Sequence, residues 1–191
     1  MSATMPRTGG TGAQPSATVK VWDILLRAFH WSFAATFAGA WLTAESERWR
    51  DVHVTLGYTM LGLIAFRLLW GLVGPRNARF ASFVRGPAAV ARYLRSLLAG
   101  RPEHHLGHNP AGAVAIVALL AVALAAIGSG GAVYNDFGGH WLEESHEFLA
   151  GTMLAVVGVH LAGVAVASWL HRENLVRAML TGRKNAPGGR P

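Results

Sequence analysis

Residues 111–133 read AGAVAIVALLAVALAAIGSGGAV, a run of 23 positions with no ionisable side chain. A membrane-spanning helix needs about 20 predominantly apolar residues, whereas the strands of a membrane barrel alternate over about 10. A helix also satisfies its own backbone hydrogen bonds in lipid. The run therefore predicts a transmembrane helix and, with it, an integral membrane protein.

Three further segments predict spans on either side of this run, at residues 28–44, 52–73 and 146–170. The first is short, and we expect preceding residues to extend its helix; the second contains a single charge, Arg67. The whole chain is 52% hydrophobic and 14% charged, against about a quarter charged in soluble domains. The predicted fold class is therefore all-α, an integral membrane four-helix bundle.

The charges of the connecting loops predict the orientation. Residues 74–110 contain six arginines and one acid, whereas residues 134–147 contain four acids and neither Lys nor Arg. Cytoplasmic loops carry the excess of basic residues, so both termini and the 74–110 loop should be cytoplasmic. The two short loops should face the periplasm or an equivalent compartment. The net charge is +7, but the basic residues lie just outside the apolar segments, where they orient a membrane protein. This placement argues against nucleic-acid binding.

The remaining segments complete the predicted organisation. Residues 1–19 are rich in Gly, Ser, Thr, Ala and Pro and predict a disordered tail. Residues 20–175 form the membrane domain, and residues 176–191 a cytoplasmic tail. Within the long loop, residues 87–99 predict a short helix on the cytoplasmic membrane surface, although a solvent-exposed loop helix is the alternative.

Histidines are the available ligands for a metal or redox group. The chain has no cysteine, which excludes disulfides, thiolate metal sites and covalent c-type haem. Four of its nine histidines lie in or at the ends of the predicted spans, and ionisable groups there usually serve a function. They are His30, His53, His146 and His160.

Their depths predict two pairs. His146 and His160 are 14 residues apart, which places both rings on one side of the fourth helix and about 21 Å apart along it. His53 should meet His146 near the periplasmic side, and His30 should meet His160 near the cytoplasmic side. Two imidazoles from different helices suit the axial positions of a haem iron, so the pattern predicts two b-type haems stacked across the membrane.

Two arginines lie near the predicted cytoplasmic pair. Arg67 is 14 residues from His53 and shares its helical face. A haem propionate would give Arg67 a charge-assisted partner, but the side chain could also snorkel to the headgroups, and both readings stay open. Arg27 could serve the same purpose, although we favour snorkelling for it.

Glycines and one loop histidine have competing interpretations. Gly57, Gly62, Gly151, Gly158 and Gly163 would admit a flat ring, but helix–helix packing explains most small residues in spans. His108 could contact a quinone head group, although we prefer a role in the cap before the third span.

Several motifs together resemble the bacterial cytochrome b561 family, which includes the b-type cytochrome subunits of nickel–iron hydrogenases. The resemblance covers about residues 20–175. The motifs are Val21-Trp22-Asp23 followed by Arg27 and His30-Trp31, His53-x3-Gly57-Tyr58, Arg67-x2-Trp70-Gly71, Gly74-Pro75-Arg76-x2-Arg79-Phe80, and Gly107-His108-Asn109-Pro110.

This resemblance implies a membrane core of four or five helices with two non-covalent b haems, ligated by histidines of the first, second and fourth helices. Here those match His30, His53, His146 and His160. Family members pass electrons between the quinone pool and a partner, which is a periplasmic c-type cytochrome, a hydrogenase, a molybdenum enzyme or, in one branch, superoxide. Hydrogenase cytochromes tend to have more than four spans, so a c-type cytochrome is the preferred partner of this electron-transfer protein or subunit.

Two functions of other classes compete with this reading. Histidine and arginine inside spans could line the path of a small proton or ion transporter. Against a transporter, no span is interrupted by proline and no repeat relates the two halves of the chain. The third reading is a haem-free membrane anchor for a redox partner.

Overall fold

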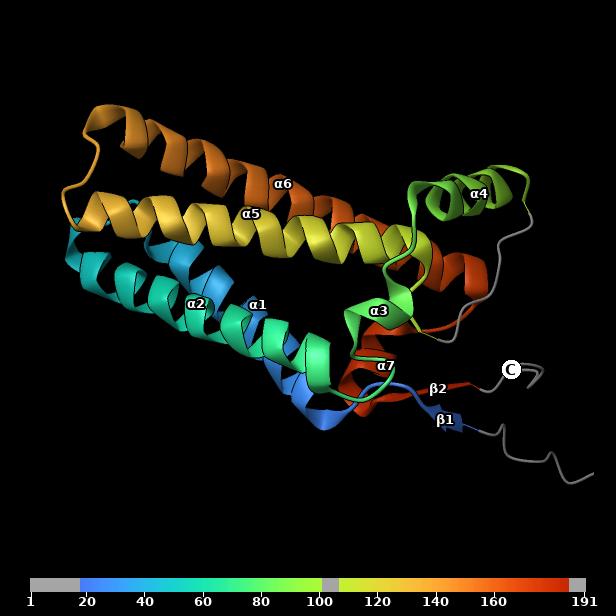
Figure 1. Ribbon diagram of the computed structural model, residues 1–191. Coiled ribbons are helices and arrows are strands. Elements are labelled where there is room, and N and C mark those ends of the chain that lie inside the picture. Colours follow the sequence, from blue (N-terminus) through green and yellow to red (C-terminus); the bar gives the residue numbers. More distant parts are fainter. Residues whose placement is uncertain (1–17, 101–106, 186–191) are drawn as a thin grey trace, which may run out of the picture.

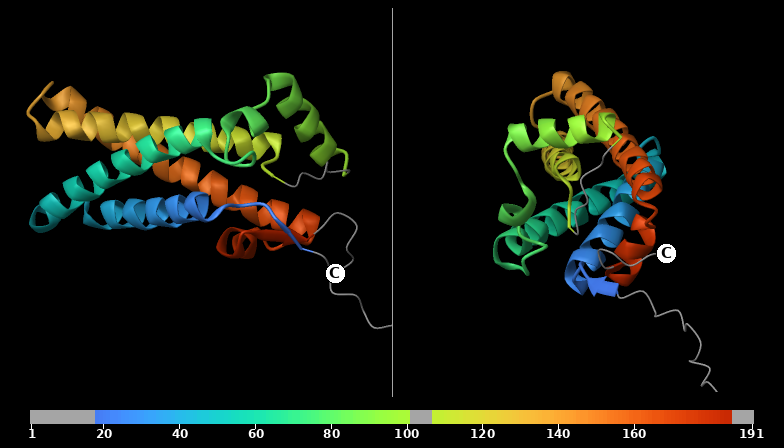
Figure 2. Two further views of the ribbon diagram at one scale, coloured as in Figure 1. Left: turned by 60° about the horizontal axis from the view of Figure 1, so that its bottom comes forward. Right: turned by 90° about the vertical axis from the view of Figure 1, so that its right-hand side faces the viewer.

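The computed structural model describes residues 18–100 and 107–185. Four long helices form two antiparallel hairpins (Figure 1). The first hairpin pairs α1 (Ile24–Thr43) with α2 (Arg50–Val73) through the 3-10 turn η1 (Glu47–Trp49), and the second pairs α5 (Pro110–Tyr134) with α6 (His140–His171). Packing of α2 against α5 joins the hairpins into one bundle. The views of Figure 2 show the same arrangement from below and from one end.

The starts of two long helices follow from local capping. The Asp23 carboxylate accepts a hydrogen bond from the Leu26 amide at 3.0 Å, and the Asn109 side chain accepts one from the Gly112 amide at 2.7 Å. Such N-caps satisfy backbone donors that the first helical turn leaves without a partner. The predicted mostly helical fold is confirmed, and α1 begins at Ile24, four residues before the predicted span, as the expected extension of this helix requires.

Three helices are long and apolar enough to cross a membrane by length and composition, and they span Glu47–Val73, Pro110–Tyr134 and His140–His171. Helix α1 has 20 residues but is not among them, because Arg27 and His30 lower its hydropathy. Three of the four expected spans are therefore supported on this criterion.

Helix α6 begins six residues earlier than the predicted span. Its first turns are polar, and His140 pairs with Glu143 at 3.3 Å and with Glu144 at 3.4 Å. Carboxylates near a helix N-terminus are stabilised by the helix dipole, so the helix continues beyond the apolar segment. Hydropathy locates the part of α6 that lipid would cover and misses this polar start.

Short elements gather at the opposite end of the bundle. They are α3 (Phe80–Phe83), α4 (Pro87–Leu98), α7 (Leu175–Thr181) and a two-stranded sheet of β1 (Thr18–Lys20) and β2 (Arg183–Asn185). Val19 pairs with Lys184, whose ammonium lies 3.3 Å from the Glu173 carboxylate. Parts of both expected tails thus fold against each other, while residues 1–17 and 186–191 of those tails lie outside the described residues. The expected helix at 87–99 corresponds to α4.

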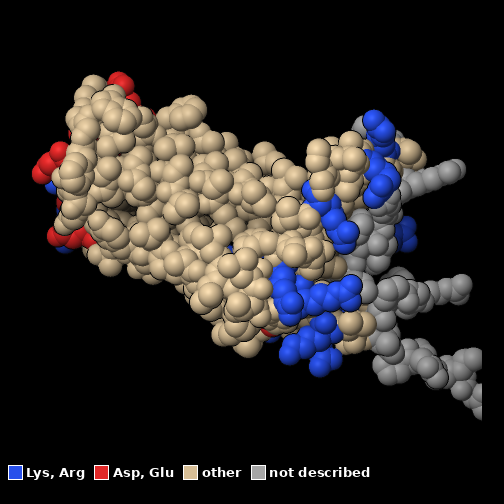
Figure 3. All heavy atoms as spheres, viewed as in Figure 1, with Lys and Arg blue, Asp and Glu red and all other residues tan. Residues whose placement is uncertain are grey.

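The two ends of the bundle differ in charge. Figure 3 shows Lys and Arg gathered at the end that carries α4, α7 and the sheet, and Asp and Glu gathered at the end that carries the two hairpin turns. We call these the basic end and the acidic end. The charge pattern read from the loops is therefore present in three dimensions.

A close approach of α2 and α3 generates a stability prediction. A Cβ atom at Gly71 would overlap the Phe80 ring, whereas one at Gly62 on the same helix would meet nothing within 4 Å. We expect Gly71→Ala to lower the free energy of unfolding in mixed micelles by about 1–3 kcal/mol through overpacking. Gly62→Ala is the matched control and should be neutral or stabilising, since both changes bring the same gain in helix propensity. Equal stability of the two variants would contradict this packing.

Candidate functional site

The four predicted ligand histidines come from three helices. His30 lies on α1, His53 on α2, and His146 and His160 on α6. All four rings are half-buried between helices. No group of three or more His, Cys, Asp or Glu side chains within residues 18–100 and 107–185 is arranged to hold a metal ion.

His53 and His146 face each other at the acidic end. Their ring centroids are 6.2 Å apart, and the ring planes are inclined by 83°. Metal–imidazole bonds are about 2 Å long and the ring centre lies roughly 1 Å beyond the nitrogen, so two rings on one iron stand roughly 6 Å apart. The predicted pair is brought together at a separation that fits shared ligation.

Backbone carbonyls fix the tautomer of both rings. His53 Nδ1 lies 2.9 Å from the Ala40 carbonyl oxygen, and His146 Nδ1 lies 2.9 Å from that of Ala126. A carbonyl only accepts, so each Nδ1 carries the proton and donates it. Each Nε2 then keeps its lone pair for a metal, and an Nδ1–H bond to a backbone carbonyl is a common way to orient a metal-ligating histidine.

The two carbonyls are accessible for different reasons. Ala40 lies in the last turn of α1, where the final four carbonyls have no intrahelical partner. Ala126 lies in mid-helix, and its carbonyl points toward residue 130, which is glycine. A Cβ at Gly130 would lie 2.7 Å from His146 Cε1, so the ring occupies the space that the missing side chain leaves. The Ser129 hydroxyl lies 3.3 Å from His146 Nδ1 beside this contact.

Two buried polar atoms lack partners near the basic end. Among the described residues, His30 Nδ1 and the Arg67 Nη1 atom are buried without a hydrogen-bond partner. Arg67 is only 2% exposed, and its guanidinium lies 4.4 Å from the centroid of the Phe80 ring. A snorkelling arginine would place its guanidinium at the surface, so this burial argues against the snorkelling alternative.

His30 and His160 lie close enough to interact electrostatically. They belong to the two helices, α1 and α6, on which the pairing by depth placed them. Arg67 and His108 lie in the same region. The basic end thus combines two imidazoles with a buried guanidinium whose Nη1 atom has no hydrogen-bond partner, although the Asp23 carboxylate lies close enough to act on its charge. A carboxylate-bearing cofactor such as haem fits this donor set.

Arg27 has a different environment from Arg67. Its Nε atom donates to the Met179 carbonyl at 3.1 Å, and its guanidinium also donates to the Leu180 carbonyl. These carbonyls belong to the last turn of α7, where a cation both fills open acceptors and complements the helix dipole. Arg27 therefore ties α1 to α7, a role that neither of its two sequence readings included.

His108 packs inside an aromatic cluster. Its ring lies 4.5 Å from the Trp22 ring and 4.7 Å from the Phe83 ring, and the cap of α5 is formed by Asn109. Burial, followed by the positive charge of Arg67, lowers the pKa of His108 to about 3. This imidazole is therefore uncharged at neutral pH, and the expectation that it helps to cap α5 is not met.

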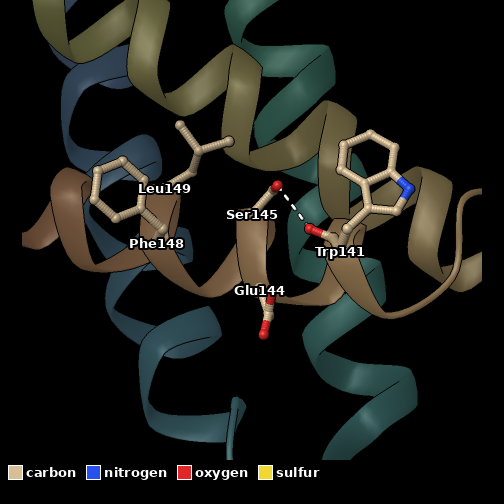
Figure 4. A pocket seen from close by; sticks show the side chains of 5 residues that line it. All are labelled: Trp141, Glu144, Ser145, Phe148 and Leu149. Carbon is tan, nitrogen blue, oxygen red and sulfur yellow. Dashed lines mark hydrogen bonds between the residues drawn. The ribbon is translucent and has the colours of Figure 1, made fainter.

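A shallow groove lies on the outer surface of α6, away from the paired rings. Trp141, Glu144, Ser145, Phe148 and Leu149 line it, and the Ser145 hydroxyl bonds the Trp141 carbonyl of its own helix (Figure 4). Trp141 and Phe148 are 63% and 73% exposed. None of the predicted ligand histidines lines this groove.

The five glycines singled out in the sequence do not pack closely against a neighbouring helix, and their reading as space for a flat ring stays a prediction. A Cβ at Gly57, Gly62, Gly151, Gly158 or Gly163 would meet nothing within 4 Å, so none of them marks the close helix contact expected of small residues. Gly130 and Ser129 were missed. The run Gly128-Ser129-Gly130-Gly131 in an otherwise alanine- and leucine-rich span was the available signal.

Comparison with known proteins supplies the family. A family model described as prokaryotic cytochrome b561 matches residues 21–182, which include all four histidines and Arg67. No curated protein and no solved structure gives a match. The chain belongs to the prokaryotic cytochrome b561 family of membrane b-type cytochromes, which act in electron transfer.

Proposed function

We propose that this protein is a di-haem cytochrome that transfers electrons between the quinone pool and a periplasmic c-type cytochrome. His53 and His146 would hold one haem b, and His30 and His160 would hold the other. When bound, each haem supplies a one-electron Fe(III)/Fe(II) couple. The protein supplies ligation, burial and spacing.

One observation carries the proposal: the contact of His53 with His146. Two rings from different helices stand 6.2 Å apart and nearly perpendicular, and both direct Nδ1 to a backbone carbonyl at 2.9 Å. A surface histidine has no need of such an arrangement. Two imidazoles from different helices at this spacing, each held through Nδ1 by a carbonyl, are what axial ligation requires.

The proposed haem site between His30 and His160 is supported by buried polar atoms that have no hydrogen-bond partner. A buried guanidinium nitrogen without a hydrogen-bond partner is costly in an apolar interior. A haem propionate would satisfy the Arg67 Nη1 atom through a charge-assisted hydrogen bond. We therefore assign Arg67 to the cofactor of the His30–His160 level, and we assign Arg27 to the attachment of α7 instead.

The charge distribution supports the orientation and the partner. With α1 as the fourth span, the basic end faces the cytoplasm and the acidic end faces the periplasm, as the positive-inside rule requires. Exposed carboxylates such as Asp136, Glu143 and Glu144 then surround the outer His53–His146 level. A partner with a basic surface would be guided to this end by electrostatic complementarity.

The purified protein tests the function directly. We expect it to be red, with a b-type reduced spectrum and about two haems per chain. Quinol should reduce the haems, and an oxidised c-type cytochrome should reoxidise them, as followed by stopped-flow absorbance. A colourless protein from haem-replete cells would overturn the proposal.

The Gly130 contact tests the outer ligand pair. Gly130→Ala places a methyl group against the His146 ring, so it should displace this predicted ligand. We expect the variant to lose roughly half of the bound haem, because the loss of support for a metal ligand weakens metal affinity about 10- to 100-fold. Gly128→Ala is the matched control, since a Cβ there meets nothing within 4 Å. Haem content and reduced spectra are the measurements, and full haem content in Gly130→Ala would argue against ligation by His146.

The topology is testable in the natural cysteine-free chain. Single cysteines at two exposed positions, Asp136→Cys at the acidic end and Arg177→Cys at the basic end, should differ in labelling by a membrane-impermeant maleimide. In spheroplasts only the first should react, and in inverted vesicles only the second. The opposite pattern would reverse the proposed orientation.

A further inference from the structure

The segment that follows α2 at the basic end carries charge of one sign. Residues 74–100 contain five arginines and neither Asp nor Glu. All five arginines are exposed, and they are Arg76, Arg79, Arg85, Arg92 and Arg95. Figure 3 shows basic side chains spread over this end of the bundle. Because exposed like charges repel one another, an anionic ligand would stabilise the segment.

Exposed apolar side chains lie beside these arginines. In the last turn of α2, Leu72 and Val73 are 71% and 65% exposed, and Arg76 follows three residues after Val73. On α4, Leu94 is 46% exposed and Arg95 is the next residue. A nucleic acid or an acidic protein would pair with the arginines and leave the apolar side chains in water. An anionic phospholipid offers phosphate to the guanidinium groups and acyl chains to the apolar side chains.

Helix α4 has the geometry of a helix that lies in a membrane surface. Going round its axis from Tyr93, which is 2% exposed, Leu94 follows at about 100° and Arg95 at about 200°. Tyr93 therefore lies on the side that faces the protein, where α4 packs against α5, and Arg95 lies on the side turned away. In both views of Figure 2, α4 crosses the direction of the long helices. Since α2 ends and α5 begins near this level, α4 lies where lipid headgroups would be.

Two arginines of the preceding loop are held in place by backbone carbonyls. Arg79 Nε donates to the Gly74 carbonyl at 2.6 Å, and the Arg85 guanidinium donates to the Ser82 carbonyl at 3.4 Å. A guanidinium has several donors, so one such bond is compatible with further bonds to phosphate oxygens. Side chains that are restricted before a ligand arrives lose less entropy when they bind it.

We propose that loop 74–86 and α4 form a binding surface for anionic phospholipid, with phosphate groups on the arginines and acyl chains against Leu72, Val73 and Leu94. This inference goes beyond the proposed electron transfer and does not depend on bound haem. The bound lipid would neutralise the basic segment and hold α4 in the plane of the headgroups.

Lipid titration of the full chain in a neutral detergent tests the surface. Native mass spectrometry would compare dioleoyl phosphatidylglycerol, which is anionic, with dioleoyl phosphatidylcholine, which has the same acyl chains and no net charge. We expect the wild-type protein to bind the anionic lipid at least about tenfold more tightly, because each arginine near an anionic lipid surface strengthens binding about fivefold. Salt should reduce this preference through screening. Equal affinities, or a preference that does not respond to salt, would overturn the inference.

Charge variants locate the surface on the molecule. The double variant Arg85→Gln/Arg95→Gln should weaken binding of the anionic lipid at least about tenfold. Arg85→Lys/Arg95→Lys keeps the charge and should retain most of the affinity. The matched control is Arg48→Gln/Arg50→Gln, which removes the same charge from exposed positions at the acidic end and should leave the affinity unchanged. An equal loss in both glutamine variants would assign the effect to net charge and refute the surface.

Two further measurements separate a phospholipid from other anions. Leu94→Ser should weaken binding of dioleoyl phosphatidylglycerol, because the acyl chains lose an apolar contact. A large excess of inorganic phosphate or of polyglutamate should not displace the lipid. Full affinity of Leu94→Ser, or displacement by inorganic phosphate or by polyglutamate, would identify a general anion surface and exclude the assigned lipid.

Discussion

A polar ring nitrogen inside an apolar bundle is stabilised by a hydrogen-bond partner, and the helices of this protein offer backbone carbonyls to His53 and His146. His53 uses Ala40, at the open end of α1, and His146 uses Ala126, in the middle of α5. Each bond joins a ligand to a neighbouring helix, so the ring orientation is set by helix packing. The whole outer site therefore depends on the register of α1 against α2 and of α5 against α6.

An apolar layer separates the two histidine levels. Ile64, Ala123 and Met153 form its buried centre, and Phe33 and Phe37 of α1 pack against it. Met153 lies seven residues from both His146 and His160, so the layer falls midway between the two pairs. Dense apolar packing there excludes water and keeps the local dielectric low, which strengthens the effect of each nearby charge or hydrogen bond. The different anchoring of the two levels can therefore persist.

Sequence reasoning predicted the helices and the approach of His53 to His146 because both follow from periodicity and depth. The 14-residue separation of His146 and His160 needs only the helical repeat, and the meeting of His53 with His146 needs only the order of spans. The hydrogen-bond acceptors of the two rings could not be predicted from the sequence, because every residue has a backbone carbonyl. Only the packing of the helices selects those of Ala40 and Ala126. The start of α6 was missed because hydropathy measures contact with lipid, whereas dipole and side-chain pairing extend a helix into water.

The partners of Arg27 at the basic end could not be predicted from the sequence either, because Met179 and Leu180 lie more than 150 residues away in the chain. The register of that end is set by a second long-range contact. Asp23 caps α1 and also accepts a hydrogen bond from the Trp70 indole at 3.1 Å. Asp23 precedes His30 by two helical turns, and Trp70 follows Arg67 by about one. One carboxylate thus fixes α1 against α2 and holds His30 at the depth of Arg67, so the ring of His30 and the buried guanidinium are positioned by the same contact.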